Sequence, residues 1–579
     1  MRCSTSPTGT ASSAPPPDSA ESSDASPERA PPPMKKLSKL LTAAVALTAA
    51  VGLLSACSTD PATSASGGAS SHVLTVGKLL PLQAVDPHKV NDGMSNEVLT
   101  AVFDGLYTLD ADGEIDPLMA ESFEKSEDGL TYTFTIRDAT WSDGTPVTAQ
   151  DFEFSWKRLV NPATAAPNSN EAVAAGIKNA NEIVNQGMDY DQLGVTALDD
   201  KTLQVELAAD VPYFQALLVR PAFLPVNEAY LAEVGDKYGQ TPETTIYNGP
   251  FTWDSWDFAN NFSVAKNADY WNADGIDLDE IKWQVVKDSQ TAALLQESGD
   301  LDFTEISGSL IDRYADSAEL TTALEVHMWY MYPNLDNPAL ANKDVRTALA
   351  TSFDKDALAN SVLKNGAEPA DYFVGKNLAI GPDGEQFRDT GDTYLPYDVD
   401  AAQAAWTSGL AALGTDSVTL RLSYWDDEAS IAQAEFIASQ WEANLPGLSI
   451  ELTSQPKATA NEQATAGDFD LYLFRWGPDY KDPMAFLELL SSTSIRDFGG
   501  YANPEYDSII AAARTADMLS QPQARWDSLH QAEDVLLGDV AVLPTVQNGI
   551  AMLINPDVHG MEVRNVSLTW NYRIVTKDD

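Results

Sequence analysis

Strand-like and helix-like patterns of apolar residues alternate along almost the whole chain, and this alternation constrains the fold more than any single motif does. Residues 131–137 place Tyr132, Phe134 and Ile136 on one face and threonines on the other, which predicts a half-buried strand. Residues 202–207 repeat the pattern. Strands and helices that take turns, without a short-period repeat, predict a mixed α/β fold in several lobes.

A helix is predicted between those two strands. Thr148, followed three residues later by Asp151, forms a capping-box-like start, and Asn161 with Pro162 ends the pattern. The apolar face of this helix consists of Phe152, Trp156, Leu159 and Val160.

The second half of the chain continues in the same way. Residues 418–424 alternate as a strand, and residues 469–474 are apolar on both sides, as in a fully buried strand. Two helices are predicted here: one capped by Asp344 that runs to Phe353, and one over residues 484–490 that begins with Asp482 as N-cap and Pro483 in its first turn.

Residues 34–57 have the features of a bacterial lipoprotein signal. Lys35 and Lys36 form a basic segment, residues 40–54 form a short apolar run, and small residues precede Cys57. The run is too short and too rich in alanine to span a membrane well, since a span needs ~20 strongly apolar residues. The motif resembles the lipobox, in which the cysteine is acylated and becomes the new N-terminus.

This signal divides the N-terminal part of the chain and predicts a location. We expect a protein anchored by lipid to the outer face of the cytoplasmic membrane, on the periplasmic or extracellular side. The expected segments are a wrongly assigned start or disordered extension over residues 1–33, the signal peptide over 34–56, and the lipidated Cys57 with a flexible tether over 57–72.

The net charge and the amino-acid composition exclude some classes of function and favour others. With 35 basic and 86 acidic residues the net charge is −51, which argues against nucleic-acid binding because phosphate contacts need clustered lysine and arginine. No cysteine follows Cys57, so the part after the tether must be stabilised by packing and not by disulfides. The 13 tryptophans and 20 tyrosines suit a large pocket with rigid aromatic walls.

Motifs for catalysis are absent from the sequence. It contains no His-Glu-x-x-His, no Gly-x-Ser-x-Gly and no phosphate-binding glycine-rich loop, and its five histidines lie far apart. Residues 110–113 resemble the start of a calcium-binding loop, but Met119 stands where that loop requires a bidentate glutamate. A hairpin turn is therefore predicted here instead. We therefore expect no catalytic residues, no metal site and no cofactor.

Several separated segments, in matching order and spacing, resemble the family 5 solute-binding proteins of bacterial ABC importers, especially the oligopeptide-binding branch. The resemblance covers essentially the whole chain after the tether. Its segments are Asp86-Pro87-His88-Lys89, Val102-Phe103-Asp104-Gly105-Leu106, Asp128 to Phe134, Trp141 to Ala149, Asp151-Phe152, Val211-Pro212-Tyr213-Phe214, Asn248-Gly249-Pro250-Phe251, Asp344 to Leu349, and Trp476-Gly477-Pro478-Asp479-Tyr480.

The resemblance implies a ligand site without catalysis. In peptide-binding members, an aspartate at the position of Asp479 receives the α-ammonium of the peptide, and the backbone around Gly477 pairs with the peptide as a strand does. A buried ammonium needs such a carboxylate partner, and backbone pairing accepts any peptide sequence. The implied ligand-binding residues are Asp479, Trp476, Gly477, Tyr480 and Arg475 on one wall, and Asn91, Asp92 and Gly93 on the other.

The resemblance also implies an architecture and partners. The expected fold is the two-lobed, class II periplasmic-binding-protein-like α/β fold, with an additional domain and a ligand cleft between the lobes. An oligopeptide, the ABC permease and, through the anchor, the membrane are the expected partners of a monomer. The expected boundaries are lobe I over 73–103, 247–330 and 549–579, the additional domain over 104–246, and lobe II over 331–548.

Departures from the family pattern leave alternatives open. Leu473 stands where a peptide binder can carry a basic residue, so recognition of the peptide C-terminus and the preferred peptide length stay open. Pro456 lies where an aromatic residue is common, and residues 372–375 match the family pattern only partly. The same fold binding an oligosaccharide or a metal chelate, and a peptide-sensing receptor, are alternatives to peptide import. A secreted hydrolase is a more distant one.

Overall fold

The computed structural model describes residues 72–78, 82, 84–90, 92–111, 113–211, 213–257, 260–478, 480–561, 563 and 570–578. The expected signal peptide, Cys57 and nearly all of the tether lie outside the described residues, and so do Asn91 and Asp479. None of the described helices is long and apolar enough to cross a membrane.

The largest sheet in the described part of the chain has eleven strands, in the order β15-β14-β16-β12-β17-β11-β1-β10-β9-β8, with β13 paired to β17. These strands are β1 (Val73–Lys78), β8 (Phe251–Asp257), β9 (Asn261–Lys266), β10 (Glu280–Val285), β11 (Phe303–Ile306), β12 (Leu320–Pro333), β13 (Glu368–Pro369), β14 (Val418–Trp425), β15 (Leu448–Gln455), β16 (Leu471–Trp476) and β17 (Leu543–Ile554).

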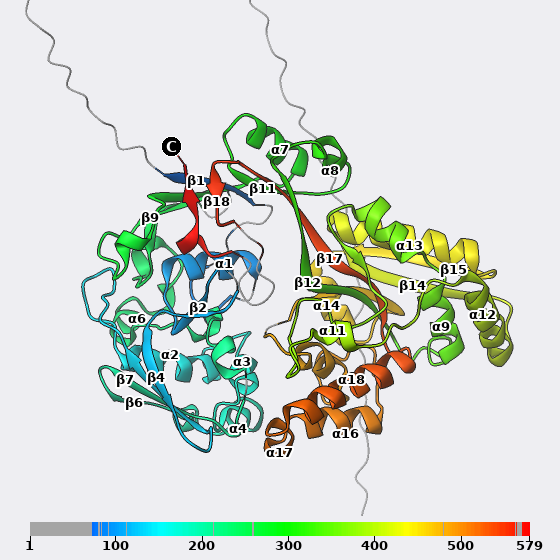
Figure 1. The fold of residues 1–579 in the computed structure, drawn as a ribbon, viewed down its shortest axis with the longest axis horizontal. Coiled ribbons are helices and arrows are strands. Elements are labelled where there is room, and N and C mark those ends of the chain that lie inside the picture. Colours follow the sequence, from blue (N-terminus) through cyan, green and yellow to red (C-terminus); the bar gives the residue numbers. More distant parts are fainter. Residues whose placement is uncertain are drawn as a thin grey trace, which may run out of the picture. The chain divides into compact units, whose positions relative to one another are not determined.

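Two long strands, β12 and β17, join the two sides of this sheet and run side by side in Figure 1. Near its start β12 pairs with the part of β17 that also pairs with β11, and near its end β12 pairs with β16. The register between β12 and β17 shifts between Leu324 and Met328. We call β11, β1, β10, β9 and β8 the β1 side of the sheet, and β16, β14 and β15 the β16 side.

Helices accompany both sides of the sheet. Helix α1 contacts β8 and α7 contacts β11 on the β1 side, whereas α13 and α14 pack on the strands of the β16 side. The helices of the β1 side are α1 (Gly93–Val102), α7 (Ser289–Glu297) and α8 (Ser309–Tyr314). The later helices are α9 (Lys343–Thr351), α10 (Lys355–Ala357), α11 (Phe387–Thr390), α12 (Val399–Leu413), α13 (Glu428–Asn444), α14 (Lys457–Thr465), α15 (Met484–Leu487), α16 (Pro504–Ala513), α17 (Ala516–Leu519) and α18 (Pro522–Gly538).

A separate four-stranded sheet with the order β4-β5-β7-β6 forms between α1 and β8 in the sequence. Its strands are β4 (Ala120–Lys125), β5 (Thr131–Ile136), β6 (Val195–Asp199) and β7 (Thr202–Glu206), and a short hairpin of β2 (Tyr107–Leu109) and β3 (Ile115–Pro117) precedes it. The helices of this region are α2 (Ala149–Val160), α3 (Asn170–Ala174), α4 (Ala180–Gln186), α5 (Phe214–Leu217) and α6 (Glu228–Val234).

The local predictions in this region are confirmed. Tyr132, Phe134 and Ile136 are buried along β5, and α2 begins after Thr148 and ends before Asn161. Asp151 Oδ2 accepts a hydrogen bond of 2.9 Å from the Thr148 amide, which is the reciprocal bond of a capping box. The predicted turn at residues 110–113 connects β2 to β3.

Four boundaries in the second half differ from the prediction. The N-cap of α9 is Asn342, whose Oδ1 accepts from the amides of Asp344 and Val345, and the helix ends at Thr351, before Phe353. Asp344 lies in the first turn instead, where its charge favours the helix dipole.

The buried strand β16 begins at Leu471, two residues later than predicted, because the carbonyl of Asp470 accepts from Asn334 in a loop. The N-cap of α15 is Pro483, and Asp482 precedes it while accepting from the Met484 amide. A 3-10 turn, η7 (Glu488–Leu490), continues α15 to the predicted end.

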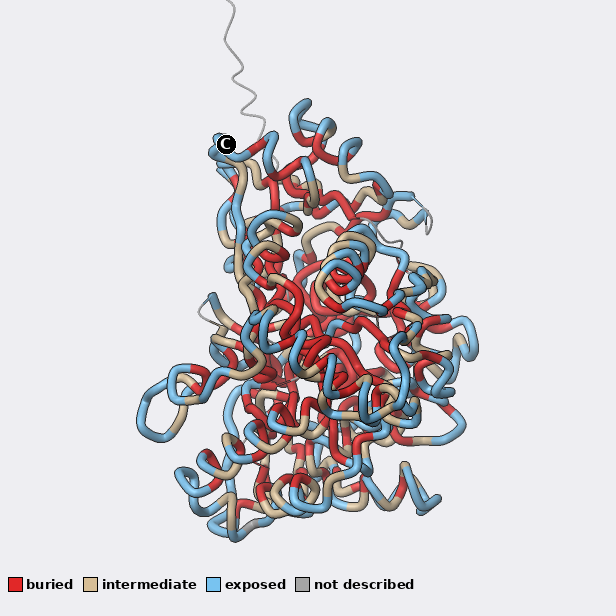
Figure 2. Tube along the Cα trace, turned by 90° about the vertical axis from the view of Figure 1, so that its right-hand side faces the viewer, coloured by how far each residue is buried: buried red, intermediate tan, exposed pale blue. Residues whose placement is uncertain are grey.

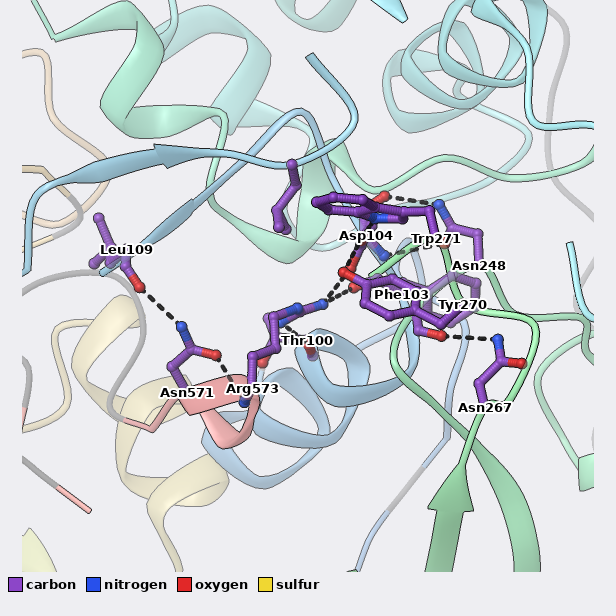
Figure 3. Close-up of polar contacts among 12 residues, drawn as sticks. Thr100, Phe103, Asp104, Leu109, Asn248, Asn267, Tyr270, Trp271, Asn571 and Arg573 are labelled. Carbon is purple, nitrogen blue, oxygen red and sulfur yellow. Dashed lines mark hydrogen bonds and ion pairs between the residues drawn. The ribbon is translucent and has the colours of Figure 1, made fainter. Parts of the chain in front are cut away.

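A buried ion pair joins the two ends of the described chain. Asp104 is fully buried, and its carboxylate accepts from Arg573 at 2.6 Å, from Tyr270 at 2.8 Å and from Trp271 at 3.0 Å (Figure 3). The backbone amide of Asp104 donates a hydrogen bond to Asn248 Oδ1, and Asn248 Nδ2 donates one to the backbone carbonyl of Asp104. Burial tends to lower the pKa of the Arg573 guanidinium, but the charge of Asp104 leaves that pKa raised.

Arg573 belongs to η8 (Tyr572–Ile574), which lies in the sequence between the paired strands β18 (Val558–His559) and β19 (Thr576–Lys577). It also donates to the carbonyls of Thr100 and Phe103 at the end of α1. Figure 2 shows buried residues following the chain through the interior of the protein, with exposed residues on its outer loops. The Asp104 network is thus one of the polar ties within the buried interior.

Candidate functional site

The candidate site begins at the end of β16, where four of the residues predicted from the sequence, Arg475, Trp476, Gly477 and Tyr480, lie close together in the chain. Antiparallel pairing with β12 sets Arg475 opposite Trp329 and Trp476 opposite Met328. Arg475 is exposed, Trp476 and Gly477 are half-buried, and Tyr480 is buried.

Gly477 leaves no room for a side chain. A Cβ added there would lie 2.2 Å from the imidazole ring of His327, which belongs to β12. Real Cβ contacts are never this close, so the glycine lets the backbone approach His327. The His327 ring therefore packs directly against the backbone at Gly477 on that side.

Three cations lie over tryptophan rings around this strand end. Lys457 Nζ is 4.5 Å from the ring centroid of Trp425, the Arg496 guanidinium is 4.3 Å from that of Trp476, and the Arg475 guanidinium is 5.2 Å from that of Trp329. Such cation–π contacts stabilise the position of a charge without neutralising it.

The tryptophans under these cations belong to one aromatic cluster. Ring centroids are 5.9 Å apart for Trp329 and Trp425, 5.5 Å for Trp425 and Phe474, and 6.5 Å for Phe474 and Trp476. The rings come from β12, β14 and β16. We call Trp329, Trp425, Phe474 and Trp476 the tryptophan floor.

The other predicted residues stand at the start of α1. Asp92 is its N-cap, and Oδ1 accepts a hydrogen bond of 2.9 Å from the Ser95 amide. Gly93 is the first helical residue and has open space where a side chain would be. Asp92 acts electrostatically on Lys457, so the start of α1 faces the β16 side.

The pKa of Lys457 reports this environment. It is lowered, mainly because burial disfavours the charged ammonium and then because Arg475 and Arg496 repel it, while Asp427 and Asp92 oppose the shift. Lys457 nevertheless is exposed to solvent.

Glu305 of β11 shows the same combination. Its side chain is 40% exposed, and Lys78 Nζ lies 3.8 Å from its carboxylate and 2.8 Å from that of Glu97. Burial is the main cause of a raised pKa, Glu325 and Glu97 add to it, and Lys78 and Arg475 oppose it. Arg475 of the β16 side is thus close enough to Glu305 of the β1 side to act on its pKa.

Direct contacts between distant parts of the chain border the site. Tyr213 and Tyr480 stack with centroids 4.0 Å apart, and burial raises the pKa of Tyr213 to about 12. Lys481 Nζ lies 3.1 Å from Glu114 Oε1. Ser307 donates to Glu428 at 2.5 Å.

The structure places Arg475, Trp476, Gly477 and Tyr480 at the end of β16 and Asp92 and Gly93 at the start of α1, while Asn91 and Asp479 lie outside the described residues. Sequence reasoning missed the residues that complete the surroundings, because each is a single side chain on another element. No local motif signals them. They are Lys457, Arg496, Trp329, Trp425, Glu305 and His327.

The described residues contain no group of three or more histidine, cysteine, aspartate or glutamate side chains that could hold a metal ion. Two cavities lie elsewhere: one of about 760 Å³ beside Asp86 and Arg158, and one of about 690 Å³ beside Asp312 and Lys364. Neither includes the end of β16. The charges and the aromatic floor identify the β16 end as the candidate site.

Comparison with known proteins defines the class. The family model of bacterial extracellular solute-binding proteins, family 5 (middle), matches residues 114–497. A dipeptide-binding protein of Lactococcus lactis subsp. cremoris is 31% identical over 506 residues, which cover 85% of this chain and 92% of that protein.

Solved structures agree. The substrate-binding domain of an oligopeptide ABC transporter from Bacillus anthracis is 35% identical with a TM-score of 0.79, over 88% of this chain and 99% of that one. Listeria monocytogenes OppA bound to peptide is 32% identical with a TM-score of 0.78, over 88% and 100%. The fold is thus the predicted mixed α/β fold of two lobes with a cleft. The chain belongs to the family 5 bacterial extracellular solute-binding proteins. A family of binding proteins also agrees with the prediction of a function without catalysis.

Proposed function

We propose that this protein captures oligopeptides outside the membrane and delivers them to an ABC importer. The observation that carries the proposal is that carboxylates of the β1 side and cations of the β16 side act on one another near the end of β16. A peptide carries both signs of charge, so it matches these features. Relatives whose names refer to dipeptides and oligopeptides support the proposal.

In this proposal the residues around Gly477 pair with the peptide backbone as a strand, and Asp479 receives its α-ammonium. Trp476 and Tyr480 shape the same wall, on which Arg475 supplies a charge. Asn91, Asp92 and Gly93 form the opposite wall. Closure of the two lobes around the peptide is the signal that the permease recognises.

The proposed lobe boundaries follow the sheet. Lobe I consists of residues 73–103, 247–330 and 549–579, the additional domain of 104–246, and lobe II of 331–548. The continuous strands β12 and β17, which join the two sides of the sheet and shift register between Leu324 and Met328, support a hinge at these crossings.

Calorimetry on the Asp479→Ala variant tests the peptide site. Loss of the carboxylate partner is expected to weaken binding of trialanine by ~2–5 kcal/mol, because the α-ammonium stays buried without a counter-charge. N-acetyl-trialanine should bind wild type and variant alike. The exposed Asp416, whose side chain forms no hydrogen bond or ion pair with a described residue, gives the control variant Asp416→Ala. Unchanged affinity for trialanine would remove Asp479 from the site.

The same protein can be screened against other ligands by thermal shift. Stabilisation by oligosaccharides or metal chelates, but not by peptides, would replace the peptide in the proposal. Cleavage of a bound peptide, followed by mass spectrometry, would indicate a hydrolase. Undiminished uptake of a labelled peptide by cells that lack the protein would favour a peptide-sensing receptor.

We further propose that Cys57 is acylated and anchors a monomer to the outer face of the cytoplasmic membrane through the tether of residues 57–72. An anchored receptor stays close to the permease, so it needs to diffuse only a short distance to reach it. Cys57→Ala should move the protein from the membrane fraction to the soluble fraction, whereas Cys3→Ala should not. Membrane retention of Cys57→Ala would refute acylation at this residue.

A further inference from the structure

Two adjacent residues that follow β16, Tyr480 and Lys481, contact the region that lies between α1 and β8 in the sequence. The rings of Tyr480 and Tyr213 are stacked, with centroids 4.0 Å apart and ring planes 13° apart. Lys481 Nζ lies 3.1 Å from Glu114 Oε1 and also donates to the carbonyl of Gly113, in the turn between β2 and β3. The end of the candidate site thus contacts two separate segments of that region.

Tyr213 is held in place by the four-stranded sheet. It is the N-cap residue of α5, and the next residue, Phe214, is fully buried. The ring centroid of Phe214 lies 4.8 Å from that of Tyr132 and 6.5 Å from that of Phe134, both in β5. The sheet therefore fixes the position from which the Tyr213 ring reaches Tyr480.

The region that carries Tyr213 is joined to the β1 side by buried ion pairs. Arg158 of α2 donates two hydrogen bonds, of 2.8 and 2.6 Å, to Asp86, which follows β1 in the sequence. Arg573, near the end of the chain, lies 2.6 Å from Asp104. Breaking a buried pair is costly, so this region moves together with the β1 side.

Tyr480 is held on the β16 side instead. Its hydroxyl donates to Glu488 Oε1 at 3.0 Å, and its carbonyl accepts from the Asp482 amide at 2.9 Å. The Asp482 carboxylate in turn accepts two hydrogen bonds, of 2.7 and 2.9 Å, from Arg525 of α18. Each ring of the stacked pair is therefore anchored to a different side of the protein.

We propose that Tyr213 is a positioning residue of the peptide site: its ring holds Tyr480 while the lobes are closed and thereby slows the release of the peptide. This inference rests on the proposed peptide function and gives the additional domain a role in it. The two rings must separate when the lobes move apart, so the stacking free energy favours the closed state alone. The Lys481–Glu114 pair adds little, because its side chains are 37% and 74% exposed.

Stopped-flow tryptophan fluorescence with trialanine measures the rates of association and release. Tyr213→Ala is expected to release trialanine about tenfold faster than wild type, because the closed state loses the stacked ring. Its association rate should stay within about twofold of wild type, since the peptide enters before the rings meet. A general defect in the fold would not divide the two rates in this way.

Two further variants separate the ring from the space that it fills. Tyr213→Phe keeps the aromatic ring and should release trialanine at the wild-type rate. Tyr213→Leu keeps an apolar side chain without the ring and should release it faster, and this variant decides the question if Tyr213→Ala does not fold. Thermal unfolding checks the fold of each variant.

The matched control is Tyr230→Ala. Tyr230 is also a half-buried tyrosine of the additional domain, but its hydroxyl donates to the carbonyl of Glu243, at 2.9 Å, within the same domain. This variant should keep the wild-type release rate.

Wild-type release rates in Tyr213→Ala and Tyr213→Leu, or equal acceleration by Tyr213→Phe and Tyr230→Ala, would overturn the role of the Tyr213 ring while leaving peptide binding in place. A failure of the proposed function looks different. In that case trialanine does not bind to wild type, and the inference falls with the function.

Discussion

Breaking the buried Asp104–Arg573 pair should destabilise the protein far more than breaking an exposed pair. Asp104 is fully buried, and the arginine side chain is 8% exposed. In Arg573→Met the carboxylate keeps its bonds from Tyr270 and Trp271 but loses its only buried counter-charge among the described residues. Removing one partner of a buried pair typically costs ~3–5 kcal/mol.

Further bonds place the expected effect within that range. The arginine also donates to two backbone carbonyls at the end of α1, which the methionine leaves without that donor. Each lost bond of this kind adds ~1 kcal/mol, and burial of the methionine side chain offsets part of it. We expect the free energy of unfolding to fall by about 4 kcal/mol.

Urea unfolding, followed by tryptophan fluorescence and circular dichroism, measures this difference. The Asp104→Asn variant and the double variant complete a mutant cycle, and because the two residues are in contact, the double variant should lose less than the sum of the single losses. Lys178→Met is the control, since the side chains of Lys178 and Glu206 are 50% and 45% exposed and such a pair contributes under about 1 kcal/mol. A loss below about 1 kcal/mol in Arg573→Met, or additive losses in the cycle, would refute the reasoning.

Two more predictions follow from buried groups. Gly477→Ala forces a methyl group against the His327 ring, and we expect this overpacking, of ~1–3 kcal/mol, to appear as weaker peptide binding in calorimetry. The control is Gly538→Ala, because the position of its added methyl group is open. Full peptide binding by Gly477→Ala would contradict the steric argument. Burial, and then the charge of Arg158, lowers the pKa of His88 to about 3. The unfolded chain, with a histidine pKa near 6.5, binds that proton more readily, so His88 disfavours folding progressively as the pH falls from about 6.5 toward 3, by about 3 kcal/mol at pH 4. Between pH 7 and pH 4 the free energy of unfolding should therefore fall less steeply in His88→Gln than in wild type. The control His559→Gln, at an exposed histidine, should keep the wild-type slope. Equal slopes in all three proteins would be inconsistent with a neutral, buried His88.

Local chemistry made some elements predictable. Thr148 and Asp151 fix the start of α2 through bonds within one turn, and alternation of buried residues fixes β5. The cap of α9 was wrong by two residues because Asn342 and Asp344 are both good caps and only the folded backbone decides between them. Elements were thus easier to predict than their boundaries.

The candidate site was predictable only where its residues are contiguous. Arg475 to Tyr480 follow one another at the end of one strand, so a family motif identifies them. Lys457 and Arg496 come from a helix start and a loop, and Trp329 belongs to a strand more than a hundred residues earlier. Their meeting depends on the pairing of β12 with β16 and on the loop after η7, which no short stretch of sequence encodes.

The place of β17 in the sheet has a consequence for how the chain is made. This strand is among the last elements to be synthesised, yet it lies between β12 and β11 and pairs with both. Until it arrives, β12 and β11 each present an open edge, and unpaired edges promote association between chains. The sheet therefore cannot be completed during synthesis, and the nascent chain depends on protection from aggregation until its final segment is released.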